Sequence, residues 1–331
     1  MAGIFCFVPQ NPVPAANKFV RFMNAVAIPL LLFVARQTLR LKTITRATTA
    51  AGAFYWAMAA VVTCLVTAVC HLDIVAVTPR ISSVLHYLSA VLLLTPLVHM
   101  LGARRPGITA WPWFVIFPLI IILQWPAISE LMGDSSDAAI RIPSPTVVGF
   151  MLVLLMGSGN YFGTSCTTSM VFGVAGIMLI LLPVTEWMAF RNERLFLPGC
   201  AMLAAATALL PRRFFRRDME NSPPEQLWRD FRDLYGIVWA KRVMDRVNQF
   251  AEREHWDVRM TLDGFQFLDA GPEDNTTETG TSGPANEGTQ SSPAAARSMQ
   301  VLCWVLRRFA DPEFLRRYVP DSVELPQRPV N

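Results

Sequence analysis

The chain has 331 residues, of which 53% are hydrophobic and only 16% are charged. A soluble domain is typically about one quarter charged, so this composition excludes an ordinary soluble protein and indicates membrane segments. The charge is uneven, because residues 1–211 contain 12 Lys/Arg and 6 Asp/Glu while the remainder contains 17 and 19. The basicity therefore belongs to loops beside a membrane, and without a DNA- or RNA-binding motif we expect no nucleic-acid partner.

The first apolar stretch, residues 25–35, leaves open how the N-terminal part of the chain meets the membrane. It has 11 uncharged apolar residues, whereas a spanning helix needs about 20. Three interpretations are open: a short first span, an amphipathic helix in the interface, and the hydrophobic region of a signal peptide. The last is the weakest, because cleavage needs a small residue where Phe33 stands, and Arg36 follows directly. We assign residues 1–48 to an N-terminal segment with a marginal membrane helix at about 19–35 and a basic loop.

Six stronger apolar segments follow, each with 16–21 residues and no Lys, Arg, Asp or Glu except Glu186 at one end. This length crosses the hydrocarbon with modest adjustment. Residues 49–211 are therefore predicted to form an all-α multi-pass transmembrane bundle of six firm helices, preceded by the marginal one. The six segments are residues 50–70, 81–101, 109–127, 145–162, 169–187 and 195–210.

Basic residues occur in alternate loops of this bundle. Residues 36–48, residues 102–108 and the start of 212–331 are basic, whereas the loops between them are net acidic or nearly uncharged. Basic loops face the cytoplasm, so we expect the C-terminus inside. The last segment ends in a cluster that we expect to contact membrane headgroups: Arg212, Arg213, Arg216 and Arg217.

Glycines gather near the fifth and sixth segments. Small residues let helices approach closely, which makes this group the expected place for such a contact: Gly157, Gly159 and Gly163 with Gly173 and Gly176. For residues 157–163 we favour a flexible turn, because Asn160 and a Ser/Thr run interrupt the apolar pattern there.

Few residues could carry chemistry. The six segments have no charged residue in mid-span, although such residues are the usual sign of function inside a membrane. His86 and His99 are 13 positions apart, and Thr164, Ser165 and Cys166 have no base beside them in sequence. Hydrolase and nucleotide-binding motifs and metal-ligand spacings are absent from the sequence. We therefore predict no catalytic residue, no cofactor and no metal.

The last third reads as water-soluble. Residues 222–254 predict one amphipathic helix with an apolar stripe at intervals of three and four, which Gly236 is expected to weaken or bend. Residues 256–262 alternate as a strand does, and Asp263-Gly264 forms a turn before the returning strand at 265–267.

The chain after residue 211 therefore divides into three parts. Residues 212–269 hold the basic juxtamembrane segment, the amphipathic helix and the hairpin. Residues 270–297 have no large apolar side chain and are expected to be a disordered linker, and residues 298–331 hold C-terminal helices. Together they predict a small cytoplasmic α+β tail domain. Its aromatic stripe either packs against residues 301–309 or binds a partner or the membrane surface, and its interaction candidates are Trp228, Phe231, Tyr235 and Trp239.

Four stretches together resemble a family of uncharacterised bacterial multi-pass membrane proteins: LGARRPGITAWPWFVIFPLIIILQWPA, GSGNYFGT, FRDLYGIVWAKRVMDRVNQ and LRRFADPEF. The resemblance covers most of the chain outside the N-terminus and the linker. It implies a bacterial cytoplasmic (inner) membrane and no known activity.

The leading hypothesis is a non-enzymatic membrane scaffold or adaptor whose tail binds a cytoplasmic protein. It is motivated by the lack of charge inside the bundle and by the aromatic stripe. The alternative is a transporter or channel for a neutral or lipidic solute, and the third is an intramembrane enzyme. The expected partners are the lipid bilayer and a protein bound through the C-terminal domain.

Overall fold

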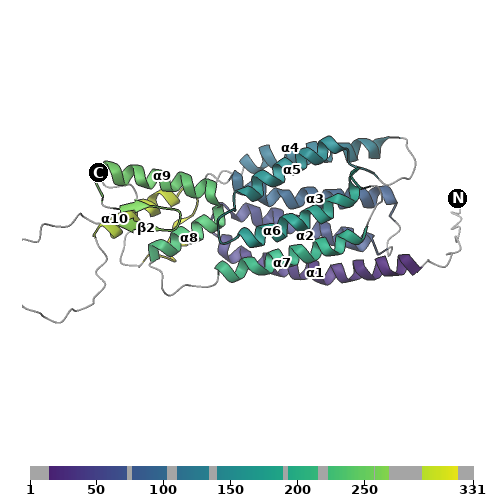
Figure 1. Ribbon diagram of the computed structural model, residues 1–331, viewed down its shortest axis with the longest axis horizontal. Coiled ribbons are helices and arrows are strands. Elements are labelled where there is room, and N and C mark those ends of the chain that lie inside the picture. Colours follow the sequence, from purple (N-terminus) through teal and green to yellow (C-terminus); the bar gives the residue numbers. More distant parts are fainter. Residues whose placement is uncertain are drawn as a thin grey trace, which may run out of the picture.

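The computed structural model is mostly helical, with one small pair of strands. Helices α1–α7 form an elongated bundle. The later elements, from α8 onward, lie together at one end of this bundle, and we call them the tail (Figure 1). The residues that the structure describes are 15–72, 77–102, 110–133, 140–188, 193–214, 223–256, 258–267 and 293–319.

Each apolar segment expected from the sequence contains a helix, with ends shifted by a few residues. Two short 3-10 helices, η1 (Leu182–Val184) and η2 (Glu193–Leu195), lie between the last two bundle helices. The bundle helices are α1 (Ala15–Thr45), α2 (Ala51–Cys70), α3 (Pro79–Leu101), α4 (Ala110–Met132), α5 (Ser144–Gly159), α6 (Thr167–Leu181) and α7 (Phe196–Phe214).

Five helical segments of the described chain are long and apolar enough to cross a membrane. They lie in α1, α2, α3, α4 and the continuous stretch of α6 and η1, whereas α5 and the apolar part of α7 (Phe196–Leu210) are shorter. The expectation of a multi-pass helical membrane protein is confirmed at this level. The crossing by α5 and α7 stays a prediction.

Helix α1 is longer than the marginal stretch suggested. It has 31 residues, and its part from Arg21 to Thr45 is a candidate span of 25 residues. The apolar stretch in the sequence ends at Arg36, but the helix continues through Arg36 and Arg40, whose side chains are exposed. The expected basic loop over 36–48 is thus largely helix, and its length favours the spanning interpretation.

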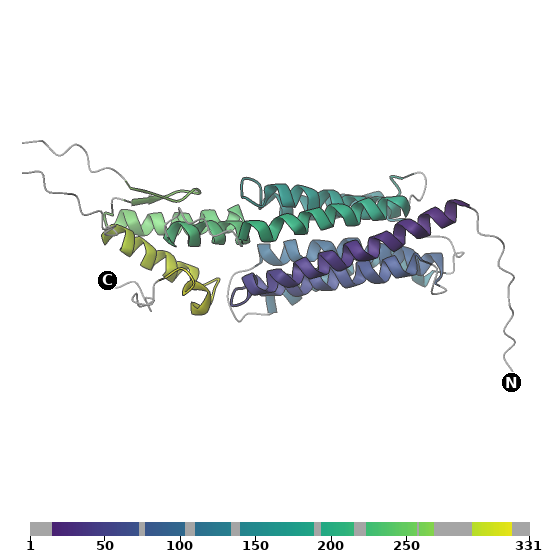
Figure 2. The ribbon, with the colours of Figure 1, turned by 90° about the horizontal axis from the view of Figure 1, so that it is seen from below.

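The bundle has two distinct ends. At one end, the backbone N–H of Ile142 donates to Val184 O at 2.8 Å, and the rings of His71 and Phe196 lie 5.5 Å apart. The C-terminal ends of α2, α4 and α6 therefore lie there. The C-terminal ends of α1, α3 and α5 lie at the opposite end, next to the tail (Figure 2).

Helix α3 is central, packed against α2, α4, α5 and α6. The Tyr87 hydroxyl donates to Leu123 O on α4 at 2.8 Å, and His86 Nε2 lies 2.7 Å from Ile180 O on α6. Between apolar helices in lipid, such polar contacts add specificity, because water does not replace a lost partner. They bind α3 to its neighbours.

Helices α6 and α7 meet at a pair of glycines. A Cβ atom on Gly176 would lie 3.0 Å from Gly199 O and 2.9 Å from the Leu203 side chain, and a Cβ atom on Gly199 would lie 2.7 Å from Ile180. The backbones therefore approach more closely than side chains would allow. The expected close contact at Gly176 is present. The turn favoured for residues 157–163 is wrong in its first part, because α5 continues to Gly159 and a Cβ atom on Gly157 would lie only 2.7 Å from Leu97 Cβ on α3; the turn begins at Asn160.

The tail begins with two helices where the sequence predicted one. Helices α8 (Pro223–Tyr235) and α9 (Ile237–Arg253) are separated by Gly236, which has a φ of +80°. Glycine adopts this conformation without steric cost, unlike other residues. The prediction of one continuous helix over 222–254 is wrong, although the glycine expected to weaken it is where it breaks.

The hairpin expected after α9 is present. Strands β1 (Val258–Met260) and β2 (Phe265–Phe267) pair antiparallel across the Asp263-Gly264 turn, with Val258 opposite Phe267. The side-chain amide of Asn248 on α9 bonds both backbone groups of Met260, at 2.7 and 2.9 Å. These bonds attach the hairpin to α9.

Two helices complete the described tail. Helix α10 (Pro293–Leu306) begins inside the stretch assigned to the linker, so residues 293–297 are helical. Helix α11 (Pro312–Leu315) follows Asp311, which occupies the N-cap position without a capping bond from its side chain. The rest of the expected linker, up to residue 292, lies outside the described residues.

We predict that Gly176→Ala lowers the stability of the bundle, because the added methyl group has no room against α7. Overpacking of this kind typically costs about 1–3 kcal/mol. The control is Gly149→Ala in α5, where the added carbon would meet no atom within 4 Å. Thermal unfolding in mild detergent, followed by tryptophan fluorescence, measures both. Equal melting temperatures for the two variants would contradict the close contact.

Candidate functional site

The tail meets the bundle through a dense set of contacts between distant parts of the chain, which we call the junction. On the bundle side it comprises residues 45–50, Met100 and residues 160–166. On the tail side it comprises residues 232–239 and 309–317. Its contacts form the candidate functional site, because they determine how the tail is held.

The bundle loop 160–166 is a tight turn held by its own side chains. The Thr164 hydroxyl donates to Tyr161 O at 2.7 Å and accepts from Cys166 N at 3.2 Å. The Thr167 hydroxyl donates to the same Tyr161 carbonyl at 3.0 Å. Hydroxyl side chains bonded to nearby backbone are typical of turns, so the Ser/Thr run that interrupts the apolar pattern builds a defined loop.

Asn160 binds the break between α8 and α9 with three hydrogen bonds. Its Nδ2 donates to Tyr235 O at 2.9 Å, its Oδ1 accepts from Val238 N at 3.0 Å, and its carbonyl accepts from Ile237 N at 2.7 Å. Helix ends have backbone groups without partners inside the helix. Asn160 supplies those partners from the bundle, so the end of α8 and the start of α9 are satisfied only when the tail is docked.

Gly236 is the residue that makes this approach feasible. A Cβ atom at this position would lie 2.3 Å from Asn160 Nδ2 and 2.4 Å from Asn160 O. With its positive φ, the position therefore excludes every other residue on two independent grounds.

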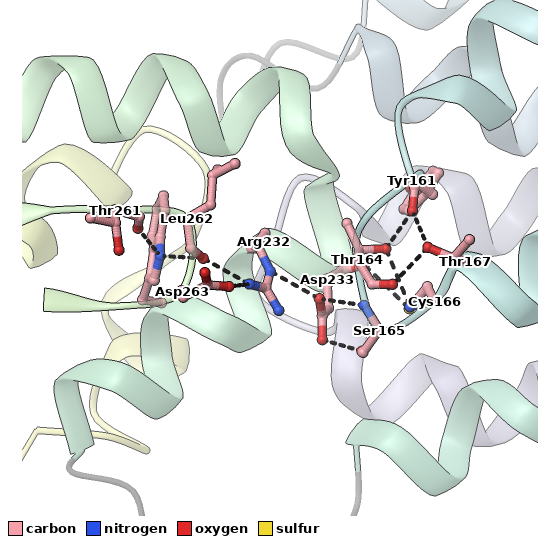
Figure 3. A network of polar contacts seen from close by, with 11 residues as sticks. Tyr161, Thr164, Ser165, Cys166, Thr167, Arg232, Asp233, Thr261, Leu262 and Asp263 are labelled. Atoms are coloured by element: carbon pink, nitrogen blue, oxygen red, sulfur yellow. Dashed lines mark hydrogen bonds and ion pairs between the residues drawn. The ribbon is translucent and has the colours of Figure 1, made fainter.

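A second polar chain runs through Asp233 (Figure 3). Ser165 donates to its carboxylate through both the backbone N–H, at 3.2 Å, and the hydroxyl. Arg232 Nε lies 3.3 Å from the same carboxylate, and Arg232 Nη1 donates to Leu262 O at 2.7 Å. The chain connects the bundle loop, α8 and the hairpin turn, which includes Asp263.

Asp233 gives Ser165 an acidic neighbour that the sequence did not show. Both Ser165 donors are directed to this carboxylate, and Arg232 neutralises it, with Asp233 and Arg232 side chains only 12% and 13% exposed. A serine nucleophile normally needs an imidazole or amine base. The arrangement therefore fixes a loop, and the Cys166 thiol, 3.6 Å from the Asp233 carbonyl, adds to the same attachment.

The segment between α1 and α2 forms the other half of the junction. Thr49 N donates to Phe309 O at 2.8 Å, Asp311 N donates to Ala47 O at 2.8 Å, and Thr48 pairs with Ala310 as an antiparallel bridge. This short backbone ladder joins the segment between α1 and α2 to the segment between α10 and α11 of the tail.

Two aromatic side chains of the stripe bond the junction as well. The Tyr235 hydroxyl donates to Phe309 O at 2.8 Å and lies 2.9 Å from the Thr49 hydroxyl. Trp239 Nε1 donates to Met100 O at 3.1 Å, at the end of α3. Each ring is therefore buried with its polar atom satisfied, as large aromatic residues require.

The stripe forms the core between tail and bundle. The Phe309 ring lies 5.2–5.4 Å from the rings of Phe231, Tyr235 and Trp239. Trp228, Phe231, Tyr235 and Trp239 are at most 5% exposed. The four interaction candidates thus follow the core-packing interpretation, and their rings leave no open surface for a partner.

The other candidates are dispersed. His86 bonds α6 within the bundle, whereas His99 Nε2 lies 3.2 Å from Thr49 O at the tail end. Arg212 and Arg213 lie in the last turn of α7, and residues 216–217 fall outside the described chain. Sequence reasoning missed Asn160 and Asp233 as junction residues; their signal was an amide beside a Ser/Thr-rich turn and a glycine inside a helix pattern.

No family model, curated protein or solved structure matches the chain. The resemblance to uncharacterised bacterial membrane proteins therefore stays a prediction. Within the described residues, no three His, Cys, Asp or Glu side chains gather to hold a metal ion. The fold and junction define a multi-pass helical membrane protein with a tail docked on the bundle, and function has to be argued from that geometry.

We predict that Asn160→Ala loosens the tail, because it removes two side-chain hydrogen bonds, one to the buried Tyr235 carbonyl and one from the partly buried Val238 N–H. The loss of such bonds typically costs about 1–3 kcal/mol each. Hydrogen exchange in detergent measures the effect at the Ile237 and Val238 amides, which should exchange faster. Gly159→Ala is the control, since its added carbon meets open space. Unchanged exchange in Asn160→Ala would contradict the assignment of these bonds.

Alkaline pH should open the junction through Tyr235. Burial raises the pKa of its hydroxyl from 10 to about 12, an effect that hydrogen bonds from Thr49 and Thr48 oppose. The stabilisation is therefore complete below pH 10 and is lost as the pH rises through about 12. A difference titration of phenolate absorbance between wild type and Tyr235→Phe measures this pKa. A difference group titrating near 10 would contradict the burial.

Proposed function

We propose that the protein is a non-enzymatic membrane scaffold or adaptor, in which the bundle anchors a tail that binds another protein. The observation that carries the proposal is the junction, which holds the tail by backbone and side-chain bonds at several points. A tail fixed in this way presents its outer surface in one orientation. Pre-organisation of that kind lowers the entropic cost of binding a partner.

We place the tail at the cytoplasmic face of a bacterial inner membrane, with seven helices crossing the bilayer. Basic residues support this orientation, because the tail end of the bundle carries most of them and positive loops stay inside. They include Arg36, Arg40, Lys42 and Arg46 on and after α1, and Arg212 and Arg213 at the end of α7.

The partner surface that we propose is the exposed face of α9. Arg242, Arg246 and Arg253 are exposed on this helix at intervals of four and seven, which places them on one side. Arg242 lies 4.7 Å from the Trp239 ring, and Arg246 and Arg253 lie 5.1 and 5.9 Å from the Phe250 ring. Stacking fixes a guanidinium while its N–H edge stays available to a carboxylate.

Helix α10 extends this surface. The Trp304 ring packs edge-on against Phe250 at 5.6 Å, and Arg308 lies 6.0 Å from Trp304. Glu254 pairs with Arg253 at 3.7 Å, but both side chains are largely exposed, so this pair is weak. The surface therefore fits an acidic segment of a protein partner.

Two observations favour an adaptor over an intramembrane enzyme. The candidate side chains His86, His99 and Cys166 each contact a different backbone carbonyl. Ser165 contacts a carboxylate that is already paired. In the described residues these groups serve packing and attachment.

We predict that Arg246→Gln with Arg253→Gln lowers partner occupancy about tenfold, which corresponds to roughly 1.4 kcal/mol. Neither arginine belongs to the junction, so the fold should persist. Full-length protein purified in gentle detergent, with co-purifying proteins quantified by mass spectrometry, gives the occupancy. A chain truncated after Arg217 should lose the partner completely.

The matched control removes two exposed arginines of α1 that lie outside the junction, as Arg36→Gln with Arg40→Gln. This control should retain the partner at wild-type occupancy. Equal co-purification with all the full-length variants would contradict the proposed surface. Equal recovery from the truncated chain would remove the tail from the function altogether.

A further inference from the structure

A group of cations lies on the membrane side of the junction, apart from the α9 face. Its members come from the last turn of α1 and the residue after it, and from the residue pair that follows α11. We call this group the basic seam: Lys42, Arg46, Arg316 and Arg317. All four are exposed.

The two segments of the seam are held together by specific bonds. Arg317 Nη1 donates to Thr43 O at 3.4 Å, in the last turn of α1, where backbone carbonyls are without helical partners. Asp311 N donates to Ala47 O at 2.8 Å. The cations of α1 and of the tail therefore come together only when the tail is docked.

The seam lies at the end of the bundle where Tyr and Trp side chains are exposed at the helix ends. Lys42 Nζ is 5.9 Å from the Phe54 ring in the first turn of α2. The adjacent Tyr55 is 63% exposed, and Trp113, in the first turn of α4, is 57% exposed. Exposed Tyr and Trp at helix ends mark the headgroup region. Lipid phosphates of that region would be within reach of the seam.

Charge complementarity supports the same occupant. The seam brings four positive charges, and its two segments contain two exposed acids, Asp311 and Glu313. Arg46 and Arg316 make no ion pair or side-chain hydrogen bond within the described chain, so their guanidinium groups are available. Arginine binds phosphate oxygens with two parallel hydrogen bonds, which suits a lipid headgroup.

We propose that the basic seam binds the phosphate headgroups of anionic lipids, and that the docked tail completes this site. Lipid bound there bridges α1 and α11 and so holds the tail on the bundle. The proposal does not rest on the adaptor function, because it uses other residues and another ligand. Cationic clusters beside a membrane helix gain about 1 kcal/mol per Lys or Arg from an anionic surface.

The test uses the full-length protein in detergent, titrated with phosphatidylglycerol and observed by native mass spectrometry. Arg46→Gln with Arg316→Gln should weaken lipid binding about 30-fold. Arg246→Gln with Arg253→Gln removes the same charge from α9, beyond the membrane level, and should bind as wild type does. Phosphatidylcholine should bind all three proteins equally weakly.

Two outcomes would overturn the proposal. Equal phosphatidylglycerol affinity in both double variants would show that the seam contributes nothing specific. Displacement of the lipid by inorganic phosphate at equal concentration would assign the seam to a soluble anion instead.

A second readout tests the bridging role. In vesicles with about one quarter phosphatidylglycerol, the Thr49 amide should exchange hydrogen more slowly than in phosphatidylcholine vesicles. The wild type and the Arg246→Gln with Arg253→Gln variant should show this slowing, and the Arg46→Gln with Arg316→Gln variant should not. Equal exchange in the two vesicles would contradict the bridge. Partner loss without lipid loss, or the reverse, separates the adaptor function from this site.

Discussion

The structure depends on one contact, in which Asn160 of the bundle meets the backbone around Gly236 of the tail. An amphipathic helix of the length expected over 222–254 would have its apolar stripe on one side and would need a single flat partner. The break at Gly236 divides the stripe between two helices, and the positive φ creates the angle between them. The backbone groups that the break exposes then find their partners on Asn160.

The rest of the junction follows from this arrangement. Helix α8 ends at the bundle and α9 begins there, so Tyr235 and Trp239 can bury their rings at this point. The Tyr235 hydroxyl then bonds the Phe309 carbonyl, and the Trp239 Nε1 bonds the Met100 carbonyl. A polar chain through Asp233 closes one side, and the ladder between residues 47–49 and 309–311 closes the other. Apolar burial provides the favourable energy, and the hydrogen bonds around it specify one orientation.

The sequence predicts the features that depend on local pattern. Apolar segments locate the bundle helices, and the alternation of apolar and polar residues before an Asp-Gly turn locates the hairpin. Gly236 correctly marks the place where the amphipathic helix breaks. The length of α1 is misjudged because the helix tolerates Arg36 where it leaves the apolar region. The junction is not predictable in this way, since Ser165 and Asp233 are 68 positions apart and only the folded chain brings them together.

The docked tail is the central claim, and a disulfide between Thr48→Cys and Ala310→Cys tests it most directly. Paired residues of an antiparallel bridge have Cα atoms about 4.5–5.5 Å apart, within the range that a disulfide spans. Mild oxidation of intact membranes should join this pair rapidly and should leave a Thr48→Cys with Arg253→Cys pair open. If the tail does not dock on the bundle in the membrane, the two pairs will react equally slowly, and that result would contradict the junction.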